Sequence, residues 1–103
     1  MVKLKITVIK KFSPEDVFGH EMIRQDTGKV IPVCSMKKGK DYIVEDIYKM
    51  PEDFCPRVWH DTHDLITLFF YGGDMEYPEP GITYITCNDG ARPVVFKYEK
   101  IEE

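Results

Sequence analysis

Residues 50–73, MPEDFCPRVWHDTHDLITLFFYGG, contain the clearest helical pattern in the chain. Pro56 suits the first position of a helix, and it keeps the residue before it out of the helical conformation. The glycine pair at 72–73 predicts the end of the helix, because glycine adopts a left-handed cap at no steric cost. Between them, apolar residues recur with the spacing of an amphipathic helix: Val58, Trp59, Leu65, Ile66, Phe69 and Phe70. We therefore predict one main helix over about residues 56–71.

Segments of alternating apolar and polar residues lie on both sides of this helix and predict β-strands. They cover residues 3–12, 42–47, 82–87 and 94–101, with a short extended piece at 30–33. Asn88-Asp89-Gly90 is a turn sequence, so the last two strands are expected to form an antiparallel hairpin. Ser13 and Pro14 resemble a helix start and predict a short helix near 14–23. The fold class is therefore α+β, a mostly antiparallel sheet with one main helix packed across it.

Size and charge restrict the function. The chain of 103 residues is 43% hydrophobic, which predicts a single globular domain over residues 1–103. Its net charge of −4 argues against nucleic-acid binding, and no apolar segment is long enough to span a membrane. Residues 1–12 alternate as a strand does and lack the continuous apolar region of a signal peptide. We therefore expect a cytoplasmic protein.

The three cysteines occupy special positions in these predicted elements. Cys34 follows the short extended piece, Cys55 is the expected N-cap of the main helix, and Cys87 ends a strand. Strand ends and helix starts can meet at one edge of a small domain, where thiolates would suit zinc, iron or an iron–sulfur cluster. The N–H groups of the helix start would also stabilise a thiolate at Cys55. The spacing matches no standard metal signature, however, and free cysteines are often small buried packing residues.

Two histidines in the main helix are candidates for additional metal ligands. His60 and His63 are three residues apart and hence neighbours on one helical face. Asp61 or Asp64 could orient an imidazole from behind. The alternative is that HDTHD forms the solvated face of an amphipathic helix. No phosphate-binding loop or nucleophile motif accompanies these residues.

The chain also resembles a family of small, functionally uncharacterised bacterial and archaeal proteins. The resemblance rests on KITVIK near the start, a cysteine before K-x-G, the segment MPEDFCPRVW, a strand ending in Cys87 followed by Asp89, and RPVVFKYEKI. It implies that Cys34, Cys55 and Cys87 are all motif positions, and hence a shared thiolate site. The chain departs from the pattern at Asp53, where the family carries glycine, and at Ser35, where proline is common.

We therefore predict a metal centre, an iron–sulfur cluster or zinc, held by the three cysteines with their sulfurs about 4–7 Å apart. One coordination position would stay open for water, a small-molecule ligand or a partner's ligand. Whether the protein is an enzyme is left open by the sequence. The alternative is a non-enzymatic binding or assembly module with structural cysteines and an active loop at 74–81. A third hypothesis is a thiol redox protein in which Cys55 attacks. We also expect a homo-oligomer, with the amino-terminal strand or residues 71–77 in the contact.

Overall fold

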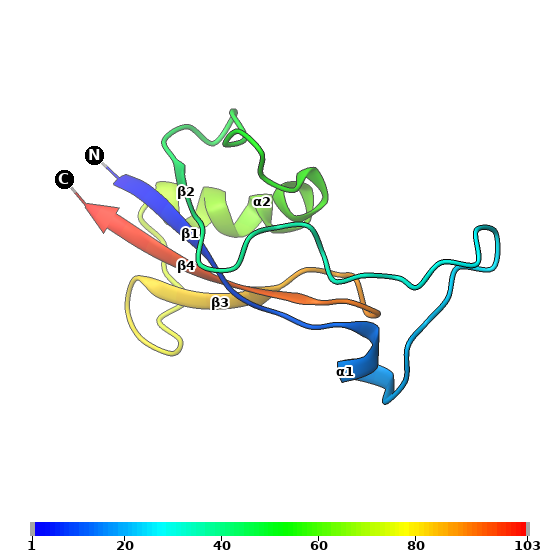
Figure 1. Cartoon of the computed structure of the whole chain (residues 1–103). Coiled ribbons are helices and arrows are strands. Elements are labelled where there is room, and N and C mark those ends of the chain that lie inside the picture. Colours follow the sequence, from blue (N-terminus) through cyan, green and yellow to red (C-terminus); the bar gives the residue numbers. More distant parts are fainter. Residues whose placement is uncertain (1, 103) are drawn as a thin grey trace.

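The computed structural model of the protein, which describes residues 2–102, is a four-stranded antiparallel sheet with one long helix across it (Figure 1). The strand order is β2-β1-β4-β3. In chain order the elements are β1 (Val2–Lys11), α1 (Pro14–Phe18), β2 (Asp41–Val44), α2 (Pro56–Phe70), β3 (Ile82–Thr86) and β4 (Val94–Glu102). The predicted α+β class, the antiparallel sheet and the main helix are confirmed.

The two strands from the ends of the chain form the centre of the sheet. β1 pairs with β4 from Val2 opposite Glu102 to Lys11 opposite Val94, with an irregularity between Val8 and Lys10. On its other side β1 pairs with β2, and β4 pairs with β3. The alternation in β1 gives one fully buried face, because the side chains of Leu4, Ile6 and Val8 are all 0% exposed.

Helix α2 covers this buried face of the sheet. It begins at Pro56, and Gly72 beyond its end has a φ of 87°, as the sequence predicts. The residues that it buries are Val58, Thr62, Ile66 and Phe69. Thr62 was not expected in the core, and it is accommodated there because its hydroxyl group is hydrogen-bonded on both sides.

Several predicted boundaries differ from the structure. The helix near 14–23 ends at Phe18, because Gly19 takes a left-handed φ of 81° and caps it. Residues 30–33 form no strand; Val30 makes an isolated bridge with Ile23. The segment between α1 and β2 instead reaches away from the sheet and returns (Figure 1), which gives the molecule its 49 × 26 × 21 Å extents. Within residues 2–102, no helix combines the length and the apolar character needed to span a membrane.

Candidate functional site

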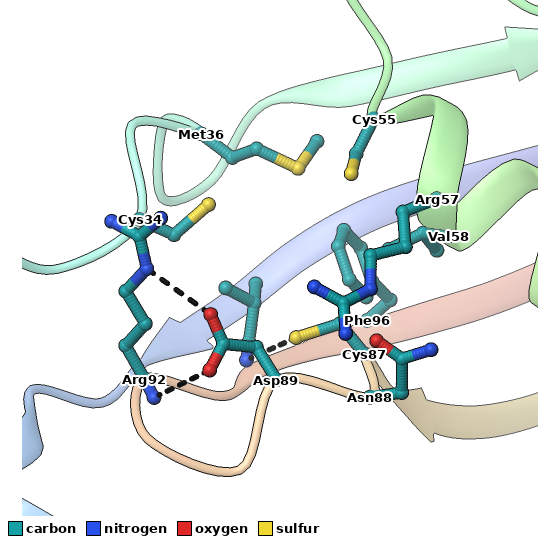
Figure 2. A pocket seen from close by; sticks show the side chains of 11 residues that line it. Cys34, Met36, Cys55, Arg57, Val58, Cys87, Asn88, Asp89, Arg92 and Phe96 are labelled. Carbon is teal, nitrogen blue, oxygen red and sulfur yellow. Dashed lines mark hydrogen bonds and ion pairs between the residues drawn. The ribbon is translucent and has the colours of Figure 1, made fainter.

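All three cysteines line one pocket between the start of α2, the end of β3 and the segment before β2 (Figure 2). Its volume is about 120 Å³. The inner wall is apolar, since Val58, Val94 and Phe96 line it and are at most 2% exposed. Met36 adds a thioether, and the remaining lining residues are polar or charged: Arg57, Asn88, Asp89 and Arg92.

Cys55 reaches the pocket because of the way the chain enters α2. Asp53 has a φ of 64°, which turns the chain, and Phe54 is then buried in the core. Cys55 follows as the N-cap, in an extended conformation that Pro56 imposes. Its side chain makes no capping hydrogen bond. The thiol is therefore free of the helix end and lines the pocket instead.

Cys87 is held where the β3–β4 connection begins. Its backbone N–H donates to the carbonyl of Val94 at 3.0 Å, and the N–H of Val94 donates back to the Cys87 sulfur at 3.3 Å. This hydrogen bond fixes the orientation of the Cys87 sulfur at the pocket. The next residue, Asn88, donates through its side-chain amide to the carboxylate of Asp61 in α2. This hydrogen bond ties the Cys87 segment to the helix that begins at Cys55.

Cys34 lies in a segment without regular structure, and cationic side chains hold that segment by its carbonyl groups. Lys11 Nζ donates to the carbonyl of Cys34 at 3.0 Å. Arg92 Nη1 donates to the carbonyl of Pro32 at 3.4 Å, while its Nε donates to Asp89 at 3.1 Å. Arg92 thus connects the segment that carries Cys34 to the loop that follows Cys87.

Asp89 is an ionised anchor for this connection. Burial alone would raise the pKa of its carboxyl group, but the N–H of Ala91 and the side chain and N–H of Arg92 outweigh burial and lower the pKa. One carboxylate oxygen accepts from both backbone N–H groups, and the other accepts from the guanidinium. The residues D-x-x-R after Cys87 therefore form one closed unit.

The histidines lie outside the pocket. The His60 side chain is 89% exposed, and its ring interacts with the neighbouring Asp61. His63 bonds to the carbonyl of Ile47 and packs edge-on against Trp59, so it holds a loop to the helix. His60 does not reach the pocket because it follows Cys55 by five residues, and five residues rotate an α-helix to about 140° from its starting direction. We therefore leave both histidines out of the site.

The sulfurs surround the pocket without closing on one point. Within residues 2–102, no three His, Cys, Asp or Glu side chains are spaced to hold a metal ion as they stand. The donor type nevertheless fits, since three thiols and a thioether are soft ligands. The pocket is also larger than a bare ion needs. One buried water occupies about 10–15 Å³ of cavity volume, and the pocket has about 120 Å³.

Comparisons with protein-family models, with curated proteins and with solved structures found no match. The assignment of a function therefore depends on the chemistry of the pocket. Sequence reasoning had placed Cys34, Cys55 and Cys87 as ligands, and it had given no role to Lys11, Met36, Asn88 or Arg92. The segments quoted for the resemblance include Arg92, but they assign it no role, and the resemblance itself stays a prediction.

Proposed function

We propose that the protein binds a metal centre, an iron–sulfur cluster or zinc, through Cys34, Cys55 and Cys87. The observation that carries this proposal is that all cysteines of the chain line one pocket, although they come from three separate segments. Cysteines that served only as small packing residues would have no reason to share a cavity. We further propose that the protein works in the cytoplasm, where reducing conditions keep such thiols available.

The surroundings of the sulfurs support a ligand role. Two of the three cysteine segments are held by polar contacts next to the cysteine. Lys11 and Arg92 hold the Cys34 segment, and Asn88 bonds the Cys87 segment to Asp61 of α2. Such contacts orient metal ligands in proteins and are often as important as the ligands. The pocket volume of about 120 Å³ favours a cluster, or an ion that carries a further ligand, over a single ion.

Binding requires the sulfurs to move closer together. Cys55 and Cys87 are attached to the ends of α2 and β3, whereas Cys34 belongs to a stretch with neither helix nor strand. A segment without regular hydrogen bonding is the least costly part to shift. We therefore expect Cys34 to move toward the other two sulfurs when the centre forms.

To test this proposal, the protein is purified without oxygen, and its metal content and absorption spectrum are measured. Both are measured again after reconstitution with iron and sulfide or with zinc. Wild-type protein with an iron–sulfur cluster should contain iron and show charge-transfer absorption. Wild-type protein with zinc should be colourless and contain zinc in a fixed ratio to the chain. Cys34→Ser, Cys55→Ser and Cys87→Ser should each lose most of the metal. His60→Ala is the matched control and should keep it. A folded wild-type protein that takes up neither metal would contradict the proposal.

The alternative function, a non-enzymatic oligomeric binding module, also has a specific observation in its favour. Tyr71, Met75 and Tyr77 are 75%, 53% and 77% exposed, and they lie on or next to the loop after α2. Large apolar side chains gathered at one place often mark a contact surface. The amino-terminal strand, the other predicted contact, offers less free edge, because β1 pairs with β4 along its length and with β2 over Leu4–Thr7.

We therefore place the proposed self-association at residues 71–77. Sedimentation velocity at high micromolar concentration should show a dimer or larger species, and Tyr71→Ser with Tyr77→Ser should reduce it. A wild-type protein that sediments as a monomer under these conditions would remove this second proposal. It would leave the metal centre unaffected.

A further inference from the structure

We propose that the pocket binds a small oxygen anion, a carboxylate or a phosphate-like ion, and that Arg57 recognises its charge. The inference deepens the proposed function, because it names the kind of ligand that would take the coordination position left open by three sulfurs. It rests on the same pocket and on one side chain that the metal centre does not use.

Arg57 is the charged lining residue that has no partner. Asp89 and Arg92 also line the pocket, and they pair with each other at 3.1 Å. Within residues 2–102, no side chain forms an ion pair or hydrogen bond with the guanidinium of Arg57. This is notable in a chain with 18 acidic and 14 basic residues, where acids are in excess. Arginine presents a planar fork of N–H donors that matches the two oxygens of a carboxylate or phosphate.

Arg57 lies at the solvent-exposed side of the pocket, and the three cysteines line its partly buried part. The side chain is exposed, whereas the next residue, Val58, is 2% exposed and forms part of the wall. Figure 2 shows the guanidinium reaching from the start of α2 toward Cys87 and Asn88. An anion held there would lie between a cation in contact with water and an apolar wall formed by Val94 and Phe96. The low dielectric of such a wall strengthens the attraction.

The charges of the loaded site leave room for one anion. Three thiolates with a divalent ion carry a net charge of minus one. Two cations adjoin them without an acidic partner in the described part of the chain: Arg57, and Lys11, whose ammonium group bonds to the carbonyl of Cys34. One further negative charge therefore brings the site to neutrality. The volume of about 120 Å³ allows a ligand of several atoms in addition to an ion.

The test is isothermal titration calorimetry with sodium acetate and, separately, sodium phosphate, each at constant ionic strength against a chloride reference. The protein is used as it purifies under reducing conditions, and its metal content is measured on the same sample. Wild-type protein should bind at least one of the two anions with one site per chain. Which of the two binds decides between a carboxylate and a phosphate-like ligand.

Three variants separate the role of Arg57 from a general effect of charge. Arg57→Gln should weaken anion binding by about tenfold or more, because it removes a charged hydrogen-bond donor. Arg57→Lys keeps the charge but not the fork, and it should fall between Arg57→Gln and wild type. Lys97→Gln is the control for loss of one positive charge, since Lys97 pairs with Glu99 within β4 and does not line the pocket, and it should bind as wild type does.

Two results would overturn the inference: a wild-type protein that binds neither anion, or an Arg57→Gln variant that binds as tightly as wild type. Metal content keeps these outcomes separate from those of the proposed function. Arg57→Gln should retain the metal of wild type, because it removes no sulfur. Wild-type protein that stays metal-free after reconstitution but binds anions through Arg57 would refute the metal centre and support anion binding in the pocket.

Discussion

Tyr98 and Thr62 form a polar contact inside an otherwise apolar core. Tyr98 is 0% exposed, and its hydroxyl group lies 2.7 Å from that of Thr62, which donates to the carbonyl of Val58 at 2.8 Å. The pair links the centre of the sheet to the first turns of α2, next to the pocket. Burial raises the pKa of Tyr98 to about 12, although the hydrogen bond with Thr62 lowers it in part.

We predict that Tyr98→Phe costs about 1 kcal/mol of unfolding free energy at neutral pH, because one buried hydrogen bond is lost. In wild type, the folded pKa lies above the unfolded value of about 10. The stabilisation from the protonated phenol is therefore fully present below about pH 10, and it is lost as the pH rises toward 12. Urea unfolding between pH 7 and 11 should show a smaller alkaline loss in Tyr98→Phe than in wild type. Tyr84→Phe, at an exposed position, should follow wild type; equal alkaline loss in all three would contradict this.

Substitution of Cys55 by serine distinguishes a helix-capping role of this residue from a metal-ligand role. Its thiol makes no capping hydrogen bond, whereas serine is among the best N-cap residues. Cys55→Ser should therefore keep or raise thermal stability in metal-free protein, by up to about 1 kcal/mol. It should lose most of the bound metal, because a neutral hydroxyl is a poor substitute for a soft thiolate. Full metal content in this variant would show that Cys55 is not a ligand.

Asp53 lies at the turn that leads into the main helix. Its φ of 64° is in the left-handed region, where glycine is unstrained and aspartate is tolerated. The resemblance inferred from the sequence implies glycine at this position, and that resemblance stays a prediction. The backbone conformation suits either residue in the turn before Cys55.

At the scale of elements, the sequence was most informative where local chemistry determines structure. Pro56 and Gly72 mark the ends of α2, and alternation marks the four strands. The predicted boundaries were less accurate where one residue ends an element. Gly19 caps α1 after Phe18, although the sequence predicted a helix near 14–23. The arrangement around the cysteines was beyond sequence reasoning, because the contact of Arg92 with Pro32 joins residues 60 positions apart. Such a contact has no local signal.

We predict that substitution of Arg92 weakens metal binding. It joins the Cys34 segment to the loop after Cys87, so Arg92→Gln should lower metal affinity by about 10- to 100-fold, as is usual for residues that orient ligands. Arg92→Lys should recover part of the loss. Competition with a chelator measures the affinity, and Lys97→Gln again serves as the control. Unchanged affinity in Arg92→Gln would show that the two segments meet without it.

At the scale of the whole molecule, the ends of the chain build the sheet and its middle builds the site. β1 and β4 pair in the centre, so the fold is not complete until the last strand is in place. The three cysteines come from the segments between these strands, and all three line one pocket. A rigid sheet that carries ligands on its connections is a common arrangement for functional sites.

We propose that the three cysteines of one pocket hold one metal centre. X-ray absorption at the metal edge of anaerobically purified or reconstituted protein can count the sulfur neighbours of that metal. We predict a shell dominated by sulfur at about 2.3 Å, with three protein thiolates, and its loss when Cys34, Cys55 and Cys87 are replaced by serine. A shell of nitrogen and oxygen alone, or one that the serine variants leave unchanged, would contradict the account.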